Sequence, residues 1–123
     1  MALPQFTLEF SSNIIEKNDM QTLFQSCHNI LANILSTEIE NCKSRAIECS
    51  NFYIGEMNTK SAFIHATLKV MPGRTKEKLA EVADAIMQTL AAHFAKSLHD
   101  LKLQITLELL ELPNIYLKVS SQH

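Results

Sequence analysis

The sequence predicts a single α+β domain of two layers, in which a tandem β-α-β repeat forms a four-stranded sheet with two helices on one face. Three stretches alternate between apolar and polar residues, which is the period of half-buried strands. Two longer stretches place apolar residues at helical spacing. The second half repeats the order of the first at an offset of about 57 residues, which indicates an internal repeat. The 123 residues are enough for one hydrophobic core.

The first β-α-β unit is expected over residues 3–56. Residues 3–10 alternate cleanly and are predicted to form its first strand. Asn18 and Asp19 can cap a helix. Its apolar positions are Met20, Leu23, Phe24, Cys27, Ile30, Leu31, Ile34 and Leu35. Residues 42–53 favour a second strand, ended by Gly55.

The second unit is expected over residues 60–113, followed by a tail at 114–123. Residues 61–70 alternate and are predicted to form a strand. Thr75 is predicted to be the N-cap of one long helix. The apolar positions of this helix are Leu79, Val82, Ala83, Ile86, Met87, Leu90, Ala91, Phe94 and Leu98. The last strand alternates from Leu101 until Pro113 stops it.

Each unit should contribute a parallel pair of strands, because strands joined through a helix run in the same direction. If both helices cover one face of the sheet, residues such as Phe63 lie on the other face. That face either packs on another subunit or is half solvated in a monomer. The sequence favours an oligomer and leaves the monomer as the alternative.

Composition argues against two classes of partner. The formal net charge is −2, and the 11 Lys and Arg residues are scattered among 13 Asp and Glu, so no basic stripe for nucleic acid is present. The apolar runs are a few residues long, far below the roughly 20 needed to span a bilayer. No basic segment followed by an apolar stretch opens the chain. We expect a soluble protein with neither nucleic-acid nor membrane partners.

Cysteine usage predicts a cytoplasmic protein. Cys27, Cys42 and Cys49 are odd in number and lack paired spacing, so they are interpreted as reduced, small apolar side chains. The sequence also lacks a His pair at i, i+4 and other metal-ligand spacings. We therefore expect no metal site.

Several short motifs occur in a recognisable order. Residues 4–14 read Pro-Gln-Phe-Thr-Leu-Glu-Phe-Ser-Ser-Asn-Ile, and residues 43–45 read Lys-Ser-Arg. Residues 62–70 read Ala-Phe-Ile-His-Ala-Thr-Leu-Lys-Val, Gly-Arg follows at 73–74, and Glu-Leu-Leu-Glu-Leu occupies 108–112. Over nearly its full length the chain resembles the 5-carboxymethyl-2-hydroxymuconate isomerases of the tautomerase superfamily. Members typically begin with Pro-His-Phe and carry Arg-Ser-Arg on the second strand.

The resemblance implies a homotrimer with an active site beside each Pro4 and no metal or organic cofactor. A free Pro4 amine would take a proton from a dienol and return it at a different carbon. Partial burial and nearby positive charge lower the pKa of an amine, which favours the base form. Arg45 and Arg74 would act as catalytic partners and, with Lys43, bind the substrate carboxylates. The implied substrate is an unsaturated 2-hydroxy or 2-oxo dicarboxylate from aromatic-compound catabolism.

Each of these side chains also has a structural interpretation. An arginine on a strand is more often solvated or ion-paired than a ligand clamp, which applies to Arg45 and Arg74. Lys43 keeps the charge of the family's arginine but lacks its planar fork, so carboxylate recognition is expected to differ. His65 lies in the matching strand and is interpreted as a packed or hydrogen-bonded residue rather than an acid or base.

The start of the chain departs from the family pattern. Because Leu3 precedes Pro4, the proline nitrogen belongs to a tertiary amide and cannot act as a base. Three explanations are open. Translation could start at position 3, where a leucine codon read as methionine would leave a free proline after processing. Proteolysis could trim the chain, or the protein could be a catalytically impaired trimeric homologue that binds small anions.

Overall fold

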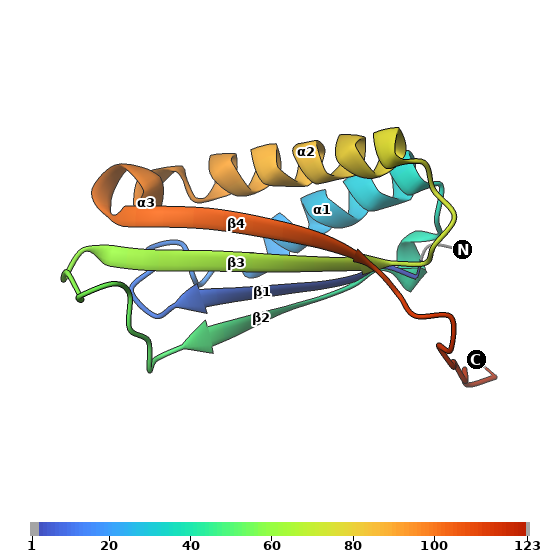
Figure 1. Ribbon diagram of the computed structural model, residues 1–123, viewed down its shortest axis with the longest axis horizontal. Coiled ribbons are helices and arrows are strands. Elements are labelled where there is room, and N and C mark those ends of the chain that lie inside the picture. The colour runs from blue at the N-terminus through green and yellow to red at the C-terminus, as the bar shows by residue number, and fades with distance from the viewer. Residues whose placement is uncertain (1–2, 123) are drawn as a thin grey trace.

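The computed structural model describes residues 3–122 as a sheet with helices packed on one side (Figure 1). The strands are β1 (Gln5–Ser11), β2 (Lys43–Cys49), β3 (Ser61–Val70) and β4 (Lys102–Glu111). The helices are α1 (Met20–Leu35), the short 3-10 helix η1 (Ile39–Asn41), α2 (Lys76–His93) and α3 (Ala95–Asp100). Both long helices lie over the same face of the sheet (Figure 1), which confirms the predicted two-layer α+β class.

The strand order is β2-β1-β3-β4. β1 pairs with β2 and β3 pairs with β4 in parallel, and the two β-α-β units join through antiparallel β1 and β3. The starts of β1 and β2 and the ends of β3 and β4 therefore lie at one end of the sheet, which we call the proline end because Pro4 precedes β1 (Figure 1). The C-terminal tail leaves β4 at this same end.

The core lies between the sheet and the helices, as the alternating patterns require. Phe6 and Leu8 of β1 and Ile64 and Leu68 of β3 are fully buried against helix residues such as Leu31. Nineteen buried residues form one cluster, and the apolar positions of β4 pack against it while remaining partly exposed. Burial of this apolar area is the main favourable contribution to folding.

Three local expectations need correction. The helix after Thr75 does not continue through Leu98 but ends at His93, and α3 begins at Ala95. The buried Ser97 explains the break, because its backbone N–H and hydroxyl both bind the Glu16 carboxylate. Asp19 occupies the N-cap of α1 without a side-chain capping bond, whereas Thr75 caps α2 by accepting from the Lys78 N–H at 3.1 Å.

The third correction concerns β2, which spans residues 43–49 rather than 42–53. Beyond Cys49 the chain leaves β1 and forms the loop that leads to β3.

No helix within residues 3–122 is both long and apolar enough to cross a bilayer.

The sheet face opposite the helices, which we call the open face, carries mostly polar side chains. Strand register arranges them in rows across the sheet: Lys43, Gln5 and Lys69 form the row nearest Pro4. The next row contains Arg45, Thr7, Thr67 and Glu108. Figure 1 shows no helix over this face, so these side chains are accessible to a ligand or a partner.

Candidate active site

Pro4 lies buried directly before β1, at the edge of the open face. Its carbonyl oxygen accepts a hydrogen bond from the Lys43 N–H at 3.2 Å, which extends the ladder between β1 and β2. Leu3 has a φ of 40°, in the left-handed region that a branched side chain adopts only with strain. The residue that blocks the proline nitrogen therefore has an unfavourable backbone conformation.

The Lys-Ser-Arg motif on β2 divides between the two faces of the sheet. Ser44 points toward the helices, where its hydroxyl lies 2.6 Å from Nε2 of His28 on α1. Burial lowers the pKa of His28, so the imidazole is neutral at neutral pH. Strand alternation then places Lys43 and Arg45 together on the open face. The spacing that the sequence singled out thus brings two cations to one surface.

Arg45 is held by neutral partners on β1. Its guanidinium donates to the Gln5 side-chain oxygen and, at 3.4 Å, to the Thr7 hydroxyl. Both arginine contacts lie beside a cavity of about 230 Å³. The side chains that line it include Gln5, Thr7, Arg45, Thr67, Lys69 and Tyr116. The exposed charge of Arg45 is therefore oriented by hydrogen bonds without being neutralised by them.

The tail adds Tyr116 to this site. The Gln5 amide nitrogen lies 3.5 Å from the Tyr116 hydroxyl and donates to it. A second cavity, of about 330 Å³, is lined by Leu3, Gln5, Lys43 and tail residues 116–120. Because Gln5 and Tyr116 line both cavities, their hydrogen bond lies between one cavity with Arg45 and another with Lys43.

Arg74 reaches the same end of the molecule but points into the helical layer. Its Nη2 donates to the Leu35 carbonyl oxygen at 2.9 Å, at the C-terminus of α1. A cation is favourable there because the last carbonyls of a helix carry partial negative charge. Arg74 lines neither cavity. The structure thus places Pro4 beside Lys43 across the β1–β2 ladder and sets Arg45 one row further along the open face, although Pro4 itself lines neither cavity. It gives Arg74 a partner outside both cavities, and a substrate contact by Arg74 stays a prediction.

Sequence reasoning missed Gln5, Lys69 and Tyr116. Gln5 and Lys69 carried a usable signal, since both alternate onto the polar face of their strands. Tyr116 carried none, because a tail outside the repeat has no register that would place it. His65 binds the Thr106 hydroxyl at 2.7 Å and Glu108 at 3.3 Å and lines neither cavity, which agrees with its structural interpretation.

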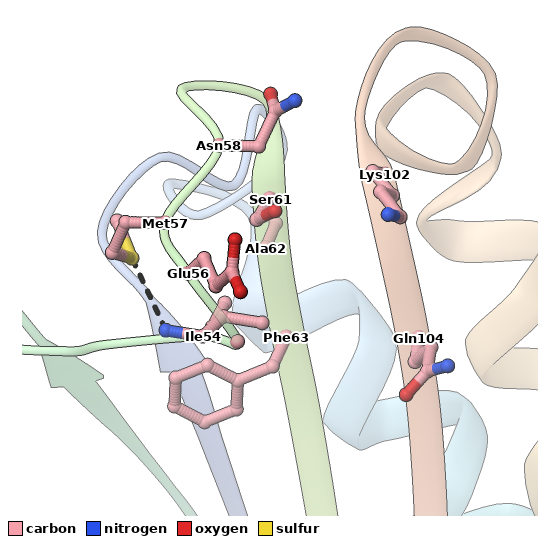
Figure 2. Close-up of a pocket in the computed structure, with 10 residues that line it drawn as sticks. Ile54, Glu56, Met57, Asn58, Ser61, Ala62, Phe63, Lys102 and Gln104 are labelled. Carbon is pink, nitrogen blue, oxygen red and sulfur yellow. Dashed lines mark hydrogen bonds between the residues drawn. The ribbon is translucent and has the colours of Figure 1, made fainter.

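A further cavity, of about 660 Å³, lies at the other end of the sheet, between the loop before β3 and the start of β4 (Figure 2). Phe63 closes one side, and Glu56 and Lys102 come from opposite walls (Figure 2). None of the sequence-predicted site residues lines it. In residues 3–122 no group of three or more His, Cys, Asp or Glu side chains is placed to hold a metal ion.

Comparisons with known proteins give one consistent result. A family model described as 5-carboxymethyl-2-hydroxymuconate isomerase matches residues 4–123. A curated 5-carboxymethyl-2-hydroxymuconate Delta-isomerase from Escherichia coli is 26% identical over 122 residues, which is 98% of this chain and 97% of the relative.

Two of the solved structures that share the fold show how far the likeness extends. The first is a 5-carboxymethyl-2-hydroxymuconate isomerase from Deinococcus radiodurans R1, with a TM-score of 0.88 and 24% identity over 97% of this chain and 91% of that one. The second is a symmetric trimer of fused wild-type 4-OT, with a TM-score of 0.68 and 14% identity over 94% of this chain and 91% of that one.

Proposed function

This chain belongs to the 5-carboxymethyl-2-hydroxymuconate isomerase family of the tautomerase superfamily, and on that premise we propose that it moves a proton between carbons of an unsaturated 2-hydroxy or 2-oxo dicarboxylate. The family match makes the protein an isomerase. The observation that carries the proposal is the placement of Lys43 and Arg45 on one face beside Pro4, at the start of adjacent strands.

The proposed roles follow from the chemistry of the side chains. A free secondary amine at Pro4 takes the proton from the dienol and returns it at another carbon of the conjugated chain. Arg45 and Lys43 bind the carboxylates and stabilise the negative charge that develops on the substrate oxygen. These steps use only groups of the protein, so the proposal needs no cofactor. Arg74 would contact the substrate only by giving up its bond to Leu35.

The active form is proposed to begin at Pro4. A nitrogen in the Leu3–Pro4 amide has its lone pair delocalised into the carbonyl, so it cannot accept a proton near neutral pH. The family match begins at Pro4, and Leu3 is strained at a φ of 40°. Both observations support a proline that is the first residue of the catalytically active chain.

The experiment compares a chain made with Pro4 as its first residue with the chain that begins at Met1. Ketonisation of 2-hydroxymuconate is followed by the change in ultraviolet absorbance. We expect turnover in the short form and almost none in the long form. A short form with Pro4→Gly is the control, because it has a free terminus without the secondary amine. Turnover by the long form alone, or full turnover by Pro4→Gly, would contradict the proline mechanism.

A second candidate function is an impaired homologue that binds small anions without turnover. The blocked Pro4 nitrogen favours it, and so does Lys43, which lacks the planar fork of the arginine in the family pattern. Inactivity of both chain lengths, with retained binding of a dicarboxylate, would establish this alternative.

We further propose that the protein is a homotrimer. The open face exposes Ile47, with 46% of its surface accessible, and the tail exposes Ile115, Leu117 and Val119, each more than 80% accessible. Apolar surface of this kind is typical of subunit contacts. The fused 4-OT neighbour with the same fold is a symmetric trimer. Light scattering should give three times the chain mass, and a monomer at all concentrations would contradict the proposal.

A further inference from the structure

We propose that Lys69, to which no role was assigned from the sequence, forms a carboxylate-binding subsite with Arg45 in the cavity that Tyr116 borders. The inference rests on the proposed function for the class of ligand, a small dicarboxylate. It adds a second cation to the Arg45 cavity, which is lined by neither of the other two predicted carboxylate ligands, Lys43 and Arg74.

Strand register places Lys69 in the row nearest Pro4. Gln5 is paired with Lys43 on one side and Lys69 on the other, so both lysines flank it on the open face. Arg45 lies one row further along β2 and is bound to Gln5. Lys69 and Arg45 line the same cavity from strands on either side of β1. A carboxylate in this cavity can therefore contact cations on two sides.

Lys69 and Arg45 are the charged side chains among the described residues that line this cavity, and its lining contains no Asp or Glu. Lys17, Lys78 and Lys96 each have an acidic partner, at 2.7, 3.4 and 3.9 Å from the lysine nitrogen. In residues 3–122, by contrast, neither Lys69 nor Arg45 forms an ion pair. The chain as a whole carries a net charge of −2, so two cations without acidic partners in one cavity are a local surplus. An anionic ligand would supply the missing charge.

The acidic side chain one row from Lys69 on the open face already has hydrogen-bond partners. Glu108 is paired across the strands with Thr67, one row from Lys69. Its Oε1 accepts from the Thr67 hydroxyl and contacts Nε2 of His65, each at 3.3 Å. These contacts direct the carboxylate toward His65, which leaves Lys69 available to a ligand.

Tyr116 contributes a neutral hydrogen-bond donor to the subsite and lines both cavities. Its hydroxyl accepts from Gln5, so the hydroxyl proton is free to point toward a carboxylate in either cavity. Gln5 connects Arg45 with Tyr116, because its side-chain oxygen accepts from the Arg45 guanidinium and its amide nitrogen donates to the Tyr116 hydroxyl. We assign Gln5 as a positioning residue, because it acts on the ligand through its neighbours.

The test measures binding of trans,trans-muconate by isothermal titration calorimetry. This dicarboxylate lacks the 2-hydroxyl group, so its binding requires no proton transfer and is measured on the chain that begins at Met1, in which the Pro4 nitrogen is an amide. Lys69→Met should weaken binding about tenfold, and Lys69→Arg should retain it. Lys102→Met is the matched control, since Lys102 is an exposed lysine at the far end of the open face. The control should change affinity less than about twofold.

A double-mutant cycle separates a shared subsite from independent effects. If Lys69 and Arg45 bind the same carboxylate, Lys69→Met should cost less in an Arg45→Met background than in the wild type. The inference is overturned if muconate does not bind the wild type, if Lys69→Met binds as the wild type does, or if Lys102→Met weakens binding equally. Failure of turnover in the Pro4-initiated chain would instead contradict the proposed reaction, since the binding measurement is independent of it.

Discussion

Substitution of the two arginines tests the proposed site, because Arg45 lines a cavity on the open face whereas Arg74 binds the C-terminus of a helix. Arg45 is exposed and bound only to the neutral side chains of Gln5 and Thr7. Arg74 is half-buried and donates to the Leu35 carbonyl at the end of α1. We therefore predict that Arg45→Met lowers activity with little effect on stability, and that Arg74→Met does the reverse.

The magnitudes follow from these contacts. An exposed side chain with neutral partners contributes about 0.5 kcal/mol or less to the free energy of unfolding, so Arg45→Met should be nearly neutral. A charged donor on a carbonyl at a helix C-terminus contributes about 1 to 2 kcal/mol, which is the expected cost of Arg74→Met. Loss of a cation that stabilises transition-state charge typically lowers kcat by about 100- to 1,000-fold, which is expected for Arg45→Met.

The assay combines urea unfolding at one protomer concentration with ketonisation kinetics, both on the chain that begins at Pro4. The fixed concentration matters because association contributes to the apparent stability of an oligomer. Arg45→Lys and Arg74→Lys serve as charge-preserving controls. The reasoning is refuted if Arg74→Met is as stable as the wild type and loses as much activity as Arg45→Met. That result would show that Arg74 leaves Leu35 to contact the substrate, as the family resemblance implies.

Three further predictions concern stability and reactivity. Burial lowers the pKa of His28 in the folded chain, so the unfolded chain binds a proton at this site more readily than the folded one. The free energy of unfolding should therefore fall as the pH drops below about 6.5. His28→Gln should flatten this pH dependence in urea titrations. Thr75→Ala removes the acceptor for the Lys78 N–H and should lower the unfolding free energy by about 1 kcal/mol, whereas Thr75→Ser should retain it. Burial raises the pKa of Cys27 to about 12, so its thiol should resist iodoacetamide at pH 8 until the chain unfolds; rapid labelling of native Cys27, detected by peptide mass, would contradict this.

Local pattern was sufficient to predict the two layers and most of the elements. Alternation in residues 61–70 has one register that buries Ile64 and Leu68, so the strand and its buried face follow directly from the sequence. The same logic extends to part of the site, because alternation puts Lys43 and Arg45 on one face of β2. The motif order also identified the family, which the family model matches over residues 4–123.

The end of the second helix was not predictable in this way. Its apolar spacing continues past Phe94, yet the helix breaks because the buried Ser97 binds Glu16, which is far away in the chain. A contact between distant residues has no periodic signature, so hydrophobic spacing alone extends the helix too far.

The sequence by itself determined the period of the three alternating strands and the two long helices, the face that each of them buries, and the presence of a proline and basic residues at the starts of strands. Only the tertiary structure decided that the two units join through β1 and β3, which sets Lys69 opposite Gln5. It also decided that Arg74 turns to Leu35 and that Tyr116 returns from the tail to Gln5. The physical reason is that local periodicity dictates which way a side chain points, whereas its neighbours depend on how separate segments pack.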